Sequence, residues 1–239
     1  MTIKTKFIDY QDGDVELQGY LAWDDAAEEK RPGVIVSHAW AGRSDFENGK
    51  AEELAKLGYV GFAIDNFGKG VLGTSKEENS ALIQPFLEDR GMLQDRMQNA
   101  VKVLNDLDEV DENRIAAIGF CFGGLCVLDL ARSGSDVNGV VSFHGLFVPP
   151  GNTEGNKIKA RILALHGWDD PMATPDQVVS LAEELSAMDA DWQIHGYGNT
   201  MHAFTNPEAN DPDFGTVYDA NADRRSWNAM QDFLSEIFN

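Results

Sequence analysis

Gly119-Phe-Cys-Phe-Gly123 stands between two apolar segments of different type. Arg114 to Ile118, before it, is a short run typical of a buried strand, and Gly124 to Ala131, after it, is typical of a helix. A strand, a G-x-S-x-G turn and a helix in this order form a nucleophile elbow, and Cys121 occupies the position of the usual serine. The sequence therefore predicts a nucleophilic cysteine on a sharp turn.

The residue types around Cys121 fit this interpretation. A strained turn packed against a helix leaves no room for a Cβ, and Gly119 and Gly123 occupy the two flanking positions. The unpaired N–H groups and the positive dipole end of the following helix favour a thiolate, and an oxyanion formed beside it. On its own, however, the pentapeptide is equally compatible with a small apolar residue in a glycine-rich turn.

An acid and a base are expected later in the chain, each on a loop after a strand. The apolar run Arg161 to Leu165 leads into His166-Gly-Trp-Asp-Asp-Pro171, which contains two carboxylates. Asp170 is the preferred acid, because the residue before a proline is held in an extended or turn conformation, and Asp169 is the alternative. The base is His202, which follows the next predicted strand.

The other four histidines are weaker candidates for the catalytic base. His144 and His166 are at predicted strand ends and His195 is inside a predicted strand, so each is expected to be structural. His38 ends the apolar run Val34 to Ser37, and the loop that begins there should supply the second oxyanion N–H.

The remaining pattern predicts an α/β fold. Thr2 to Asp9 and Asp14 to Trp23 alternate in polarity around a turn, which predicts an antiparallel hairpin. Parallel strands are predicted at Val34 to Ser37, Val60 to Ile64, Arg114 to Ile118, Gly139 to Phe143, Arg161 to Leu165 and Trp192 to His195. Helices are predicted at Asp45 to Leu57, Leu93 to Leu107, Gly123 to Ala131, Pro175 to Met188 and Asp223 to Phe238. The result is a three-layer, doubly wound, mostly parallel sheet with its site at the carboxyl ends of the strands.

Length and composition favour one domain over residues 1–239, since 239 residues with 43% hydrophobic content can bury a sizeable core. The net charge of −21 disfavours nucleic acid and anionic membranes as partners. The amino-terminal residues lack the apolar segment of a signal peptide, so a cytoplasmic location is expected. Neither cysteine belongs to a cluster with zinc-ligand spacing, and Cys126 is expected in the core.

Five segments together resemble the dienelactone hydrolase family of the α/β-hydrolase superfamily, over nearly the whole chain. They are Val34 to Gly42, Asp65 to Gly70, Gly119 to Gly124, His166 to Pro171 and Tyr197 to Phe204. The resemblance implies an α/β-hydrolase fold and a Cys121-Asp170-His202 triad that hydrolyses an enol lactone or related ester without metal or cofactor. It also implies oxyanion donors at the backbone N–H groups of Phe122 and Trp40.

One departure from the family bears on the mechanism. Family members often carry a glutamate where this chain has Ala39, and that carboxylate is thought to keep the resting cysteine protonated. We therefore expect Cys121 to rest as a thiolate paired with His202. Candidate substrate-binding residues are His38, Ala39, Lys69, Arg90, Arg96, Trp168 and Phe204, and the two arginines do not align with the carboxylate-binding arginines of the family.

The sequence thus favours a hydrolase of activated esters or enol lactones that acts on a small molecule as a monomer or homodimer. A general carboxylesterase or thioesterase on the same triad is the first alternative. A noncatalytic binding or scaffold homologue is the second. Residues 66–92, rich in Gly and Ser, are expected to be irregular, with one short helix near Ala81 to Leu87, and to form either a lid over the pocket or a surface excursion.

Overall fold

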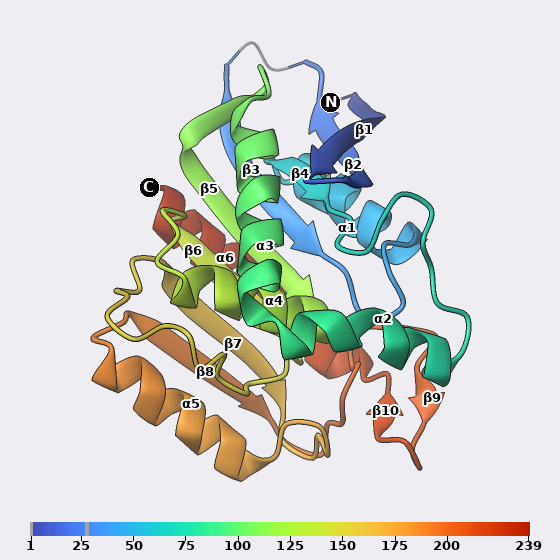
Figure 1. The fold of residues 1–239 in the computed structure, drawn as a ribbon, viewed down its shortest axis with the longest axis vertical. Helices are drawn as coiled ribbons and strands as arrows, with labels where there is room; N and C mark the ends of the chain where they lie inside the picture. The colour runs from blue at the N-terminus through green and yellow to red at the C-terminus, as the bar shows by residue number, and fades with distance from the viewer. Residues whose placement is uncertain (1, 27–28) are drawn as a thin grey trace. The chain divides into compact units, whose positions relative to one another are not determined.

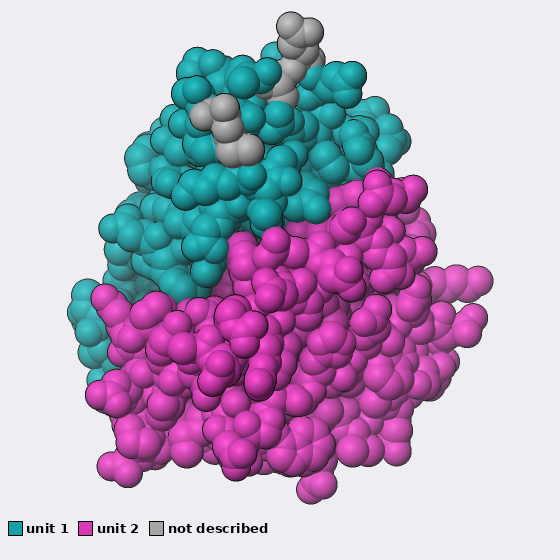
Figure 2. All heavy atoms as spheres, turned by 180° about the vertical axis from the view of Figure 1, so that it is seen from behind, with its two compact units in different colours: residues 1–118 teal, residues 119–239 magenta. Residues whose placement is uncertain are grey.

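The computed structural model describes residues 2–26 and 29–239, and Figure 1 follows their elements along the chain. The chain divides into two compact units, residues 1–118 and residues 119–239, which Figure 2 shows in different colours. The boundary falls inside strand β5 (Val110–Phe120), directly before the elbow. All three residues of the predicted triad are therefore in the second unit.

The first unit opens with the predicted hairpin. Strands β1 (Ile3–Asp12) and β2 (Val15–Asp24) pair antiparallel along their full length, from Ile3 opposite Asp24 to Asp12 opposite Val15. The two-residue turn between them places Gly13 at φ 57°, in the left-handed region that such turns require. The hairpin is confirmed; β1 extends to Asp12 rather than Asp9, and β2 has the predicted length but lies one residue later.

Strand β2 pairs antiparallel with β4 (Val60–Ala63), and β4 pairs parallel with β3 (Arg31–Ser37). Helix α1 (Asp45–Lys56) begins at a capping box, in which Ser44 and Glu47 satisfy each other's backbone N–H groups. The helix packs close to β4, since a Cβ at Gly61 would be 2.3 Å from the carbonyl oxygen of Ala51. The switch from antiparallel to parallel pairing thus occurs at β4, a position that the sequence pattern did not specify.

The segment predicted to be irregular is largely helical. Helix α2 (Lys76–Glu88) occupies half of residues 66–92, and α3 (Arg90–Asn105) follows it directly. Ser75 caps α2 by accepting from the backbone N–H of Glu78, and Asp89 caps α3 by accepting from that of Met92. Helix α2 is therefore longer than the short helix predicted near Ala81 to Leu87, and α3 starts three residues earlier than predicted.

The second unit contains parallel strands in the order β6-β7-β8. The strands are β6 (Gly139–Phe143), β7 (Arg161–Gly167) and β8 (Trp192–Tyr197). The helices are α4 (Phe122–Arg132), α5 (Pro175–Ala187) and α6 (Ala220–Phe238). Along the chain, α4 precedes the strands, α5 lies between β7 and β8, and α6 follows them. Helix α6 starts three residues before its predicted start, because Asp219 caps it by accepting from the backbone N–H groups of Asn221 and Ala222.

Two short strands interrupt the loop that follows His202. Strands β9 (Asn210–Asp211) and β10 (Thr216–Val217) pair antiparallel, and the sequence analysis did not predict them. His202 itself forms an isolated parallel bridge with Thr216. The loop is therefore ordered by this strand pairing, and it supports the backbone of His202.

A buried ion cluster joins α4 to α5. Arg132 is fully buried, and its guanidinium is 3.3 Å from Asp129 and 2.6 Å from Glu184. It also donates to the carbonyl oxygen of Phe147 at 3.0 Å. Because neither Arg132 nor Asp129 has exposed side-chain surface, their charges depend on partners inside the protein rather than on water.

No helix in the described part of the chain is both long and apolar enough to cross a membrane.

Candidate active site

The turn after β5 has the geometry of a nucleophile elbow. Cys121 has φ 56° and ψ −115°, a strained backbone conformation for a residue with a side chain. A Cβ at Gly119 would be 2.0 Å from the carbonyl oxygen of Gly123, so only glycine fits there. Helix α4 begins at the next residue, Phe122, and the thiol of Cys121 is partly exposed. The sequence interpretation of this turn is therefore confirmed in its geometry.

Asp170, rather than Asp169, contacts His202. Oδ2 of Asp170 is 2.7 Å from Nδ1 of His202, and both side chains are almost completely buried. The other carboxylate oxygen, Oδ1, accepts from the backbone N–H groups of Met172 at 2.7 Å and Ala173 at 3.3 Å. Asp169 is exposed. Of the two carboxylates considered in the sequence, Asp170 is therefore the one in contact with His202, and its catalytic role stays a prediction.

The backbone of His202 is held on both sides by the segment around β10. Its N–H donates to the carbonyl oxygen of Gly215 at 3.0 Å, and its carbonyl oxygen accepts from Val217 at 3.0 Å. Together with the bond to Asp170, these contacts fix both the position of the residue and the orientation of its ring.

The His202 ring is held in its charged form by its neighbours. Burial alone would lower the pKa of His202, but the Cys121 side chain and the hydrogen bond to Asp170 outweigh burial and raise it to about 10. The second ring nitrogen, Nε2, is buried and has no nitrogen or oxygen partner among the described residues. Among the neighbours that favour the imidazolium, the Cys121 side chain therefore has the largest effect, followed by the hydrogen bond to Asp170.

We expect Cys121→Ala to lower the pKa of His202, because the largest of the favourable charge interactions is then lost. Since the pKa of His202 is raised in the folded protein, its charged form contributes stability fully below about pH 6.5, the ordinary histidine value. That contribution is lost as the pH rises towards about 10. Titration of the histidine ring resonances by NMR measures the His202 pKa in the wild type and in Cys121→Ala.

The control for this titration is Cys126→Ala, which removes the other free cysteine, buried inside α4. It should leave the His202 titration unchanged. An unchanged His202 pKa in Cys121→Ala would mean that the two side chains do not interact as described.

Two further histidines surround this pair. The ring of His144 is 5.1 Å, centroid to centroid, from that of His202. His166, in β7, is fully buried against Phe147, and burial lowers its pKa. Both were predicted to be structural, but His144 also contacts the elbow itself, since its Nδ1 is 3.1 Å from the backbone nitrogen of Cys121.

The family follows from comparison with known proteins. Residues 17–238 match the model of the dienelactone hydrolase family. The chain belongs to this family. The solved structure m3DLH is 35% identical, with a TM-score of 0.95 and 99% of each chain covered. The dienelactone hydrolase-like promiscuous phosphotriesterase P91 from metagenomic libraries is 36% identical, with a TM-score of 0.92 and the same coverage. A putative carboxymethylenebutenolidase of Synechocystis is 27% identical, over 84% of this chain and 87% of that protein.

These likenesses confirm the α/β-hydrolase fold that the sequence predicted. The remaining candidate residues of this dienelactone hydrolase family member divide between the two units. In the second unit Phe122 is buried at the start of α4, and Phe204 is buried against the rings of His144 and Tyr197. Trp168 differs from both, because its side chain is 45% exposed.

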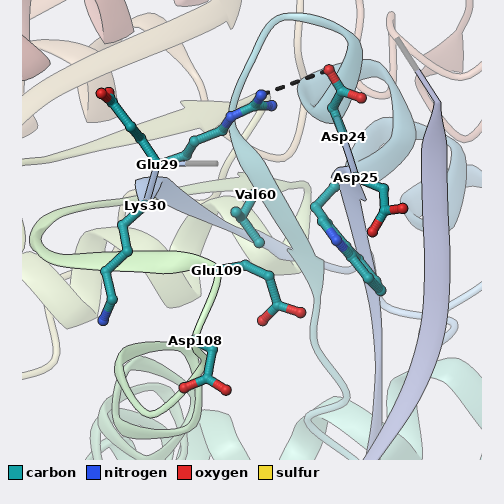
Figure 3. A pocket seen from close by; sticks show the side chains of 9 residues that line it. Asp24, Asp25, Glu29, Lys30, Val60, Asp108 and Glu109 are labelled. Carbon is teal, nitrogen blue, oxygen red and sulfur yellow. Dashed lines mark ion pairs between the residues drawn. The ribbon is translucent and has the colours of Figure 1, made fainter. Parts of the chain in front are cut away.

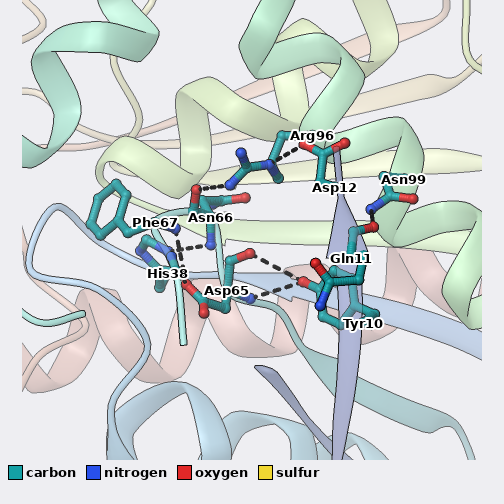
Figure 4. A network of polar contacts seen from close by, with 10 residues as sticks. Tyr10, Gln11, Asp12, His38, Asp65, Asn66, Phe67, Arg96 and Asn99 are labelled. Carbon is teal, nitrogen blue, oxygen red and sulfur yellow. Dashed lines mark hydrogen bonds and ion pairs between the residues drawn. The ribbon is translucent and has the colours of Figure 1, made fainter. Parts of the chain in front are cut away.

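In the first unit, two candidates belong to one polar network, shown in Figure 4. Nε2 of His38 accepts from the backbone N–H of Asn66 at 3.1 Å, and Nδ1 is 2.6 Å from the carbonyl oxygen of Ala39. Arg96 forms an ion pair with Asp12 and also donates to the carbonyl oxygen of Asn66. Both side chains thus make internal contacts, and a substrate-binding role for either stays a prediction.

The other candidates of the first unit have partners of different kinds. Lys69 is 2.7 Å from each of two carboxylates, Asp9 and Glu16, which neutralise it. Arg90 is buried at the start of α3, and Trp40 is half-buried. Binding roles for these residues, and an oxyanion role for Trp40, also stay predictions.

At Ala39, where the family glutamate is absent, the backbone N–H donates to a different carboxylate. The acceptor is Oε1 of Glu47, at 3.3 Å. Glu47 is buried, and its other oxygen caps α1 by accepting from Ser44. This contact was not predicted, because Glu47 is eight residues further along the chain.

A hollow of about 260 Å³ in the first unit, shown in Figure 3, contains none of the predicted site residues. It is lined by Trp23, Val60, the cations Lys30 and Arg31, and carboxylates that outnumber them: Asp24, Asp25, Glu29, Asp108 and Glu109. This acidic lining would oppose an anionic ligand.

Proposed function

We propose that this chain hydrolyses activated esters or enol lactones through an acyl-thioester on Cys121, with His202 as the base and Asp170 as the residue that orients it. The observation that carries the proposal is the buried pair of Asp170 and His202, 2.7 Å apart, whose imidazole interacts with a cysteine on a strained elbow. Membership of the dienelactone hydrolase family supports the same chemistry.

The proposed reaction begins with attack of the Cys121 thiolate on the carbonyl carbon of the ester. The carbonyl oxygen becomes an oxyanion, which the positive end of α4 and the N–H of its first residue, Phe122, favour. The intermediate collapses to a thioester and expels the alkoxide or enolate, which takes a proton from the His202 imidazolium. Neutral His202 then takes a proton from water, the hydroxide attacks the thioester, and the acid leaves as the thiolate returns.

The leaving group decides which substrates suit this route. A thiolate is itself a good leaving group, so the first intermediate returns to substrate unless the expelled oxygen is also stabilised. An enolate or a phenolate meets this condition, whereas a plain alkoxide or an amine does not. The name of the Synechocystis relative, a putative carboxymethylenebutenolidase, agrees with a lactone as substrate.

The test is acylation by p-nitrophenyl acetate, followed by intact-protein mass spectrometry. The wild type is expected to gain one acetyl group on Cys121 and to turn over. Cys121→Ala should gain none, and His202→Ala should turn over at least about a hundredfold more slowly, because the proton transfers lose their catalyst. Cys126→Ala serves as the matched control and should behave as the wild type.

The outcome with further substrates separates the candidate functions. A dienelactone that reacts much faster than the acetate supports the lactonase proposal, and a preference for simple aryl or thioesters supports a general esterase or thioesterase. A phosphotriester belongs in the panel, because P91 carries that activity in its description. No adduct with any of these compounds would contradict the enzymatic proposal and favour the noncatalytic alternative.

A further inference from the structure

His144 directly follows β6 and contacts two of the three segments that contribute the proposed triad, the elbow and the segment after His202. Its backbone has φ 38°, in the left-handed region, and only 2% of the residue is exposed. Nδ1 is 3.1 Å from the backbone nitrogen of Cys121, and Nε2 is 2.8 Å from Oγ1 of Thr205. One ring therefore bridges the elbow and the segment that contains His202.

These two contacts determine which nitrogen carries the proton. The backbone N–H of Cys121 can only donate, so Nδ1 of His144 must be the acceptor. The proton of a neutral ring is then on Nε2, which donates to the hydroxyl of Thr205. The Cys121 N–H is shared with the carbonyl oxygen of Phe143, at 3.0 Å, so the ring provides the second half of a three-centre bond.

The surroundings of His144 keep its ring neutral. Burial is the main cause that lowers the pKa of His144 well below its ordinary value, and the positive charge of His202 is the second. Protonation would place an N–H at Nδ1 against the N–H of Cys121 and would put two imidazolium rings 5.1 Å apart. The ring of Phe204 packs edge-on against His144 at 5.0 Å and closes a further side.

We propose that His144 is a positioning residue which, as a neutral ring with its proton on Nε2, fixes the nucleophile elbow relative to the segment that contains His202. The inference rests on the proposed roles of Cys121 and His202. It gives a function to Thr205, which is 2% exposed and only three residues after His202. A histidine that merely fills space would need neither polar partner.

The test uses replacements that keep one contact at a time. Thr205→Val removes the acceptor for Nε2 with little change of shape, and Thr205→Ser keeps it. His144→Phe removes both contacts, whereas His144→Asn keeps an acceptor at the δ position and tolerates the left-handed backbone. We expect kcat for p-nitrophenyl acetate to fall about 10- to 100-fold in Thr205→Val and His144→Phe, with KM nearly unchanged. Thr205→Ser and His144→Asn should recover most of the activity.

A second readout does not depend on turnover. Because His144 is neutral, replacing it changes no charge, so a lower His202 pKa in His144→Phe or Thr205→Val reports a looser approach of His202 to Cys121. Long-range proton–nitrogen NMR of the wild type should also show His144 neutral, with its proton on Nε2.

The results separate failure of this inference from failure of the proposed function. If the wild type does not hydrolyse any ester, the His202 titration and the His144 tautomer still test the positioning role. Unchanged kcat and unchanged His202 pKa in both Thr205→Val and His144→Phe would overturn it. So would a His144 ring with its proton on Nδ1. Should His144→Phe fail to fold, the pair Thr205→Val and Thr205→Ser decides the matter.

Discussion

Asp170→Asn is expected to lower kcat for an activated ester by about 10³- to 10⁴-fold while changing KM little. The carboxylate uses both oxygens, one for the backbone N–H groups of Met172 and Ala173 and the other for Nδ1 of His202. An amide has one oxygen, which the two backbone donors would retain, so its NH₂ group would face Nδ1. The ring would then carry its proton on Nε2, where it could not accept one from water.

The adjacent residue provides the matched control. Asp169→Asn makes the same chemical change one position earlier, on an exposed side chain, and should alter kcat by less than about twofold. Steady-state kinetics with p-nitrophenyl acetate measures both variants. Equal losses in the two would show that the general negative charge of this loop, and not the contact with His202, is what matters.

The second large effect concerns stability. Arg132→Met is expected to lower the free energy of unfolding by about 3 to 5 kcal/mol, because the buried carboxylate of Asp129 loses the positive charge 3.3 Å away from it. Glu184, whose side chain is 20% exposed, loses its partner as well, and the carbonyl of Phe147 loses a donor. Urea denaturation followed by tryptophan fluorescence measures the change, and the slope of the transition should remain that of the wild type.

Arg161→Met is the corresponding control. Arg161 also contacts two carboxylates, Asp191 at 3.3 Å and Glu236 at 3.7 Å, but its side chain is 43% exposed. Water replaces such contacts readily, so the loss should be below about 1 kcal/mol. If both arginine variants lost similar stability, burial would not be the property that makes the Arg132 cluster important. Arg132→Met combined with Asp129→Leu should recover part of the loss, because the buried carboxylate that lost its arginine is then removed as well.

Sequence patterns were informative where the structure depends on local chemistry. Alternating polarity and a Gly-containing turn predicted the hairpin. The glycines of the elbow predicted the sharp turn, and Gly119 is required there because the carbonyl of Gly123 leaves no room for a Cβ. The order of nucleophile, acid and base in the chain predicts that Asp170 and His202 lie together, and the two side chains are in contact. The preference for Asp170 over Asp169 depends on a local effect, the conformation that Pro171 imposes.

The features that were missed depend on contacts between distant residues. Helix α2 has few buried residues, so its apolar pattern is weak and the segment reads as irregular. Strands β9 and β10 are two residues each, too short to show any alternation. The partner of His144, Thr205, is 61 residues away, and an isolated threonine in a loop gives no signal in a sequence.

The support of His202 by residues beyond it also has a consequence for the order of biosynthesis. Its N–H and carbonyl groups are bonded to Gly215 and Val217, which a ribosome adds later than the histidine. A chain that stops before residue 215 contains both Cys121 and His202 but lacks the two backbone partners of the histidine. Such a nascent chain has its nucleophile without these restraints on the base, which can form only after residues 215–217 have been added and have left the ribosome.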